Sequence, residues 1–148
     1  EIDEIYVKGE ALIDQEIQKA GDIDTAVVIM KYVDSTLAVI DNSRKAAYGY
    51  DQRIEVFGSK GMIQVNNIKV DNSKLYNQNG IISSLPMDFF LERYMEAYKI
   101  EIQDFVDSVI NNRGVSVTGI DGLKSLQIGL AAKKSLLENR PVKIIEIK

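Results

Sequence analysis

The chain has 148 residues, 45% of them hydrophobic, and a formal net charge of −4 at pH 7, which suits one globular domain over residues 1–148. It contains no Cys and no His, which excludes disulfides and thiolate nucleophiles and removes the commonest general base and metal ligand. Acidic and basic residues are interspersed without a basic stripe, so no nucleic acid partner is expected.

The first half of the sequence is typical of β-strands, because short apolar or alternating segments are separated by turn residues. A β-branched run is followed by Asp34 and Ser35, which predict a hairpin. A second hairpin is predicted around the glycines of residues 58–61. Residues 66–84 are polar with sparse apolar positions, which favours short edge strands. The predicted strands span residues 4–12, 25–32, 36–44, 52–57 and 62–65.

After Pro86 the apolar residues follow steps of three and four, which predicts a helix over residues 88–112. A second helix is predicted over residues 121–138, with Asp121 as its N-cap. The tail, residues 142–147, alternates like one last strand. The predicted fold class is therefore α+β, an open and mainly antiparallel sheet with helices packed on one face. The stripe of the first helix, which is expected to pack on that sheet, is Leu91, Tyr94, Tyr98, Ile102, Phe105 and Val109. The second helix carries Leu123, Leu126, Leu130 and Leu137 along one face.

Three patterns are missing from the sequence. The longest apolar runs fall far short of the roughly 20 residues that span a bilayer, and the first residues lack a leader pattern, so we expect no membrane partner and a cytoplasmic protein. A glycine-rich phosphate loop between a strand and a helix is also missing, together with the alternating βαβ pattern of a nucleotide-binding fold. We therefore expect this chain alone to bind no NAD.

Several segments carry a family resemblance when they are taken together. They are residues 21–28 (GDIDTAVV), 40–44 (IDNSR), 48–61 (YGYDQRIEVFGSKG), 93–98 (RYMEAY) and 101–105 (EIQDF). This combination resembles inositol 2-dehydrogenases of the glucose–fructose oxidoreductase, inositol dehydrogenase and rhizopine-catabolism (Gfo/Idh/MocA) family. Residues 121–123 resemble the start of that family's next helix, so the likeness covers nearly the whole chain.

The resemblance implies a two-domain enzyme. Its N-terminal Rossmann domain would carry NAD, and its C-terminal open sheet would form one wall of a polyol or sugar pocket and most contacts of a homo-oligomer. Only the C-terminal part is expected here. The family's catalytic Lys, Asp and His fall outside this sequence, so no catalytic, cofactor-binding or metal residue is assigned, and the chain alone is expected to be inactive.

Four residues are candidates for substrate contact. The family's polyol-contacting tyrosine corresponds to Tyr50, and Tyr48 shares its sheet face if both lie on a strand. A phenol offers one hydroxyl and a rigid ring, which suits a hydroxyl-rich substrate. Asn42 and Arg44 alternate with Ile40, so they could point into a cleft or toward another subunit.

Each candidate also has a structural interpretation. The tyrosines could be ordinary half-buried sheet residues, and Arg44 could be a solvated cation at a strand end. Asp22 and Asp24 precede a strand and are interpreted as turn and cap residues, because a hard cation needs about six oxygen ligands.

Two further readings of function stay open. The domain could be a sugar-binding or self-assembling scaffold with no redox chemistry, or it could serve a related enzyme that acts on a different sugar.

Overall fold

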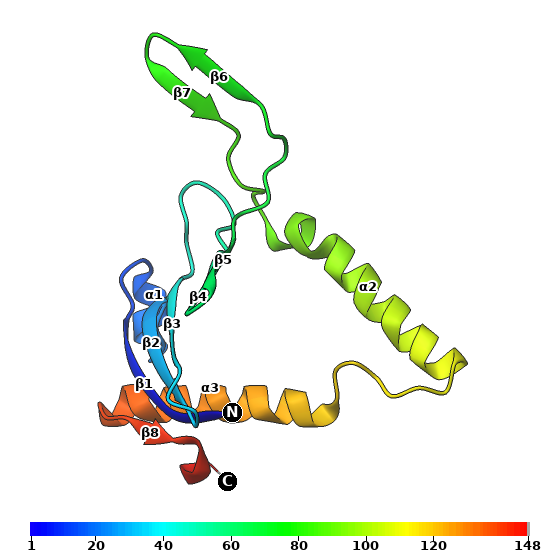
Figure 1. Cartoon of the computed structure of the whole chain (residues 1–148). Coiled ribbons are helices and arrows are strands. Elements are labelled where there is room, and N and C mark those ends of the chain that lie inside the picture. The colour runs from blue at the N-terminus through cyan, green and yellow to red at the C-terminus, as the bar shows by residue number, and fades with distance from the viewer. Residues whose placement is uncertain (148) are drawn as a thin grey trace. The chain divides into compact units, whose positions relative to one another are not determined.

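The computed structural model describes residues 1–147, which form two compact units. The first unit comprises residues 1–45 and 116–147, and the second comprises Ala46–Val115. Figure 1 shows the first unit in blue, cyan, orange and red, and the second from cyan to yellow. Each unit is described by itself.

The first unit is built on a four-stranded sheet with the order β3-β2-β1-β8, in which every pair of neighbours is antiparallel. The long hairpin of β2 and β3 is the one that the β-branched run predicts. Its turn is made possible by Ser35, whose φ of 68° lies in the left-handed region. The strands are β1 (Ile2–Glu10), β2 (Thr25–Tyr32), β3 (Leu37–Ser43) and β8 (Val142–Lys143).

One face of this sheet packs on helix α3 (Gly119–Glu138) and forms the core (Figure 1). Ile5 of β1 lies opposite Met30 of β2, and both are buried with Ala131 of α3. The hydroxyl of Ser135, also fully buried, accepts a hydrogen bond from the N–H of Val7 at 3.0 Å. The helix therefore meets β1 through small residues, which allow a close approach.

The leucine stripe predicted along α3 is not the face that packs on the sheet. The four leucines of that stripe are exposed, with Leu137 at 74%, whereas the buried face carries Ala131 and Ser135 with Leu136 packed beside them. The predicted N-cap is also wrong: Thr118 caps the helix, and Asp121 is the N3 partner of the capping box. Periodicity detected the helix, but the larger apolar residues did not mark the side that meets the sheet.

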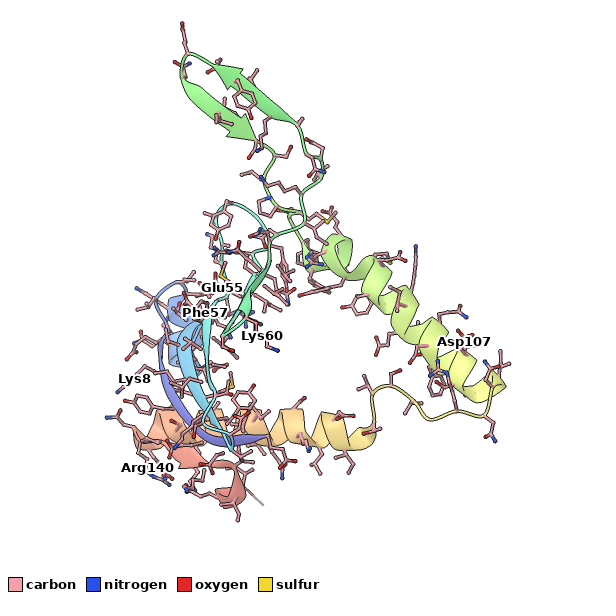
Figure 2. The ribbon with its side chains drawn as sticks, in the orientation of Figure 1. Lys8, Glu55, Phe57, Lys60, Asp107 and Arg140 are labelled. Carbon is pink, nitrogen blue, oxygen red and sulfur yellow. The ribbon has the colours of Figure 1, made fainter. Side chains whose placement is uncertain are left out.

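The tail is a strand only in part. After β8 the chain turns into a 3₁₀ helix, η1 (Ile144–Glu146), so the predicted strand over residues 142–147 is wrong beyond its second residue. The carboxylate of Glu146 accepts from the Lys143 N–H at 3.0 Å, from Lys134 at 2.9 Å and from Arg140 at 2.7 Å. Figure 2 labels Arg140 near the tail. These bonds fold the tail back and end the strand.

A short helix that the sequence analysis did not predict follows β1. It is α1 (Gln15–Lys19), and the side chain of Asp14 caps it by accepting from the N–H of Glu16 at 2.9 Å. The predicted first strand ran on to residue 12, but β1 ends at Glu10, because the Asp24 carboxylate takes up the N–H groups that follow.

The second unit holds two separate antiparallel hairpins and one long helix. The first hairpin was expected from its glycine turn, whereas the second lies where the sequence predicted only short edge strands. Figure 1 shows the β6–β7 hairpin standing apart from the β4–β5 hairpin and from α2. The elements are β4 (Ile54–Gly58), β5 (Gly61–Val65), β6 (Lys74–Asn77), β7 (Gly80–Ser83) and α2 (Phe90–Ile110).

The apolar stripe of α2 is largely exposed in the single chain. Ile102 is 65% exposed and Phe105 is 59% exposed. The prediction that this stripe is core is therefore wrong for the chain on its own, although the helix bounds were predicted to within two residues. No helix within residues 1–147 has both the length and the apolar character needed to cross a membrane.

Candidate functional site

The two candidate tyrosines lie in a loop between β3 and β4, which we call the tyrosine loop and define as residues 46–53. They do not share a sheet face, so that prediction is wrong. The reason is Gly49, whose φ of 125° is in a region that favours glycine and breaks the strand spacing between Tyr48 and Tyr50. The side chains of Tyr48 and Tyr50 are therefore not held in the alternation of one strand.

The tyrosine loop is held against the segment that precedes α2. The N–H of Tyr50 donates to the carbonyl of Met87 at 2.7 Å. At Gly49 the two backbones approach so closely that a Cβ would lie 2.9 Å from the carbonyl oxygen of Pro86. Met87 in turn donates its N–H to Ile68 at 3.2 Å. Backbone contacts alone therefore fix the position of the Tyr50 main chain.

The ring of Tyr50 meets the ring of Tyr94 from α2 edge to face, with centroids 5.7 Å apart. The Tyr94 hydroxyl donates to Oε1 of Gln52, which belongs to the same loop. Burial, and then the neighbouring phenol of Tyr50, raise the pKa of Tyr94. Tyr94 was expected from the sequence in a core stripe, and its contact with the tyrosine loop was not foreseen. Its position in the RYMEAY segment beside the predicted helix start was the only signal.

Asp51 collects most of the polar contacts in the tyrosine loop. Its carboxylate accepts from Arg53 through Nε at 2.8 Å and Nη2 at 2.9 Å, and from Nδ2 of Asn67 at 2.7 Å. The Tyr48 hydroxyl donates to the same carboxylate. Hydrogen bonds from Arg53, Tyr48 and Asn67 lower the pKa of Asp51 to about 2.

The contacts of the two tyrosines differ. The hydrogen bond to Asp51 raises the pKa of Tyr48 and uses its hydroxyl hydrogen for a contact within the loop. Tyr50 has its backbone and its ring held, and its side chain is half-buried. Tyr48 is suited to positioning, and Tyr50 is the better placed of the two to meet a ligand hydroxyl.

Asn42 and Arg44 lie in the first unit, at the far end of β3. Asn42 pairs with Ala26 across the β2–β3 ladder, and both Asn42 and Arg44 are exposed. Just beyond the strand, the N–H of Arg44 donates to the carbonyl of Asp24 at 2.9 Å. The two side chains line a shallow hollow together with Asp24 and Thr25.

Asp24 has a structural task. It is only 4% exposed, and its carboxylate accepts from the N–H groups of Leu12, Ile13 and Asp14, each at 2.9 Å. Burial would raise the pKa of Asp24, but these backbone hydrogen bonds outweigh it and bring the value to about 2. Asp22 accepts from the N–H of Ile23 at 2.9 Å, which fits its reading as a turn residue.

The first unit is an open antiparallel sheet backed by one helix, and the second unit carries the tyrosine loop. This combination can be compared with known protein families. The model of the family described as "Oxidoreductase family, C-terminal alpha/beta domain" matches residues 7–144. The chain therefore belongs to this family, and the resemblance and the α+β fold class expected from the sequence are confirmed.

Several of its relatives are named as inositol dehydrogenases. The chain is 48% identical over 147 residues to a myo-inositol 2-dehydrogenase of Thermotoga maritima, covering 99% of this chain and 44% of that protein. It is 40% identical over 133 residues to an inositol 2-dehydrogenase of Rhizobium meliloti, covering 90% and 40%. The chain thus spans less than half the length of these relatives.

Solved structures agree with this relationship. A probable dehydrogenase from Thermotoga maritima superposes with a TM-score of 0.97 at 47% identity, covering 100% of this chain and 44% of that one. A scyllo-inositol dehydrogenase from Lactobacillus casei, solved with NAD(H) and scyllo-inositol, gives a TM-score of 0.89 at 32% identity, covering 98% and 43%.

Proposed function

We propose that this chain is the substrate-side domain of an NAD-dependent inositol dehydrogenase, and that it forms one wall of a cyclitol pocket whose catalytic groups lie in another domain of a longer protein. Support comes from relatives named for inositol oxidation that are more than twice its length. The structurally similar scyllo-inositol dehydrogenase from Lactobacillus casei was solved with NAD(H) and scyllo-inositol. The observation that carries the proposal is the tyrosine loop with its held Tyr50 ring.

The residues present do not fit NAD. Within residues 1–147, β1 leads into α1, and β7 into α2, through connections without glycine, whereas a dinucleotide site needs a glycine-rich loop at that junction. We therefore propose that the nicotinamide and the hydride-transfer groups belong to an N-terminal domain and that this chain alone is inactive. A cytoplasmic location follows from use of the intracellular NAD pool.

Within the tyrosine loop, Tyr50 is the proposed substrate contact. Its phenol can donate to or accept from a cyclitol hydroxyl, and its ring gives the cyclitol an apolar wall. Tyr48 and Asp51 position the loop by their shared hydrogen bond. Asn42 and Arg44 are proposed as further substrate-side groups, because their exposed polar ends are uncommitted to the core of the first unit.

The outer face of the four-stranded sheet is proposed as a contact with a second copy of the chain. Its centre is apolar, with Ile29 44% and Val39 65% exposed. Glu4 and Lys31 pair at one end of that face, and Val27 with Asp41 beside Lys8 occupy the other. A twofold axis between two copies would place acidic groups of one copy opposite basic groups of the other, which makes the face self-complementary.

The direct test is activity of the full-length protein. With NAD and either myo-inositol or scyllo-inositol, absorbance of NADH should rise with inositol concentration, and the isolated chain should give no signal under the same conditions. A full-length protein that binds inositol by calorimetry but reduces no NAD would favour the sugar-binding or scaffold reading instead. Activity with another sugar and none with inositol would keep the enzyme class and change the substrate.

A further inference from the structure

Backbone hydrogen bonds hold the main chain of Tyr50, but the two residues that follow it depend on a side chain. Oδ1 of Asn67 accepts from the N–H of Gln52 at 2.7 Å. Nδ2 of the same amide donates to the Asp51 carboxylate at 2.7 Å. Asn67 directly precedes Ile68, which takes part in the backbone bonds that hold Tyr50. Two adjacent residues of one segment therefore anchor successive parts of the tyrosine loop.

The two partners of Asn67 specify the kind of side chain that can hold them. Asp51, with a pKa of about 2, is ionised at neutral pH and can only accept, whereas the N–H of Gln52 can only donate. One planar group must therefore present a donor to one partner and an acceptor to the other. Asparagine does so, while aspartate, which has the same size, presents two acceptors. The same Asp51 carboxylate also accepts from the Tyr48 hydroxyl.

Asn67 lies just past the open end of the β4–β5 hairpin. The last pair of that ladder joins Ile54 with Val65, and Gln52 and Asn67 each lie two residues beyond it. The side-chain oxygen of Asn67 thus takes the place of a backbone carbonyl on the opposite strand. The tyrosine loop is tied to the hairpin at this point by one amide and not by further strand pairing.

Gln52 extends this contact to the ring of Tyr50. Its Oε1 accepts from the hydroxyl of Tyr94, and the Tyr94 ring packs edge to face on Tyr50 with centroids 5.7 Å apart. Asn67 holds the main chain from which the Gln52 side chain projects. One amide is therefore connected to both candidate tyrosines, to one through a carboxylate and to the other through a glutamine.

We infer that Asn67 is a positioning residue, which orients Tyr48 and Tyr50 toward the cyclitol through the tyrosine loop without itself touching the substrate. The inference rests on the proposed function, because it names what holds the wall that Tyr50 contributes to the pocket. The proposed catalytic groups lie in another domain, so a disturbed loop should weaken substrate binding and leave the chemical step as it is. The effect should therefore appear in KM and not in kcat.

The test uses the full-length protein and Asn67→Asp, which replaces the donor that faces Asp51 with a second acceptor. KM for inositol should rise by roughly tenfold, with kcat within about twofold of wild type. Asn66→Asp is the matched control, since it adds the same charge one residue away. Asn66 is exposed and its side chain makes no hydrogen bond within residues 1–147, so KM should stay as it is. Wild-type KM in Asn67→Asp would overturn the inference.

The reciprocal swap distinguishes positioning from a general loss of stability. In Asp51→Asn/Asn67→Asp the amide and the carboxylate exchange places, so a donor again faces an acceptor and the N–H of Gln52 keeps its partner. KM of the swap should fall below that of Asn67→Asp alone, whereas two substitutions that only loosen the fold would add their effects. A swap whose KM equals or exceeds that of the single variant would rule out the positioning role.

Hydrogen exchange covers the case in which the charged variant misfolds or inositol is not the substrate. In Asn67→Ala the N–H of Gln52 loses its acceptor, so its exchange should accelerate by roughly tenfold, while Asn66→Ala should keep the wild-type rate. Unchanged exchange in Asn67→Ala would contradict the inference. NADH formation is read separately, so accelerated exchange in a protein that forms no NADH with inositol would refute the proposed function alone.

Discussion

Tyr50 and Tyr94 meet with their ring planes 84° apart and their centroids separated by 5.7 Å. An edge-to-face pair of this kind contributes roughly 0.5–1.5 kcal/mol beyond the apolar area it buries. One ring comes from the tyrosine loop and the other from α2. The helix therefore sets the orientation of the proposed substrate tyrosine, and changes that loosen the loop should affect substrate binding before they affect the fold of the other unit.

Gly49→Ala should disturb the tyrosine loop. An alanine there must adopt a φ near 125° and would bring its Cβ to 2.9 Å from the Pro86 oxygen, so a local cost of roughly 1–3 kcal/mol is expected. Hydrogen exchange at Tyr50, whose N–H binds Met87, should accelerate, and KM for inositol should rise. Gly114→Ala, with open space around it, is the control; equal exchange in both variants would contradict the account.

Asp51→Asn should release Tyr48. The carboxylate raises the pKa of Tyr48 by accepting a hydrogen bond from its hydroxyl, so removing the charge should return the phenol to a lower pKa. Ultraviolet difference titration at alkaline pH, compared with Asp51→Asn/Tyr48→Phe, assigns the change to that phenol. KM for inositol should rise several-fold because an amide can keep only one of the two hydrogen bonds from Arg53 and loses the ion pair with it. An unchanged phenolate titration would argue against the Tyr48–Asp51 bond.

The pKa of Asp24 makes a prediction about acid unfolding. Its folded-state pKa of about 2 lies below the ordinary value of 3.8, so the carboxylate stabilises the fold fully above the ordinary value and progressively less as pH falls toward 2. Asp24→Asn should be less stable than wild type at pH 7, and the gap should close between pH 4 and about pH 2. Urea unfolding across this range measures it. A gap that stays constant with pH would contradict an ionised Asp24.

Ser135→Ala tests the contact between α3 and β1. The hydroxyl accepts from the N–H of Val7 and donates to the Arg140 carbonyl at 2.7 Å, and the site is fully buried. The buried N–H of Val7 and the part-buried carbonyl of Arg140 lose their partner, so unfolding free energy should fall by roughly 1–3 kcal/mol. Ser125→Ala, at an exposed helix position, should change it by less than about 0.5 kcal/mol. Similar losses in both variants would count against the buried contact.

The strands and helices were largely predictable, because local patterns decide them. The β-branched run gave β2 with both ends correct, and the steps of three and four gave α2 to within two residues. The end of β1 was not predictable in this way, since the distant Asp24 carboxylate takes the next N–H groups. The tail likewise departs from a strand because Glu146 binds Arg140.

Which side of an element is buried was much less predictable. The leucines of α3 form the more apolar stripe, yet Ala131 and Ser135 face β1 because small residues permit a close approach. In the tyrosine loop, the alternation that would put Tyr48 and Tyr50 on one face fails at the positive φ of Gly49. A sequence shows that a glycine is present but not which φ it adopts, so the different contacts of Tyr48 and Tyr50 could not be predicted without the structure.

The most direct test of the central claim is the KM of the full-length protein for inositol after Tyr50→Phe. Loss of one hydroxyl contact should raise KM by roughly tenfold, equivalent to about 1.4 kcal/mol of binding, with the thermal midpoint unchanged. Tyr32→Phe, in β2 of the other unit, serves as the matched control and should leave KM as it is. Wild-type KM and kcat in Tyr50→Phe would contradict a substrate role for the tyrosine loop.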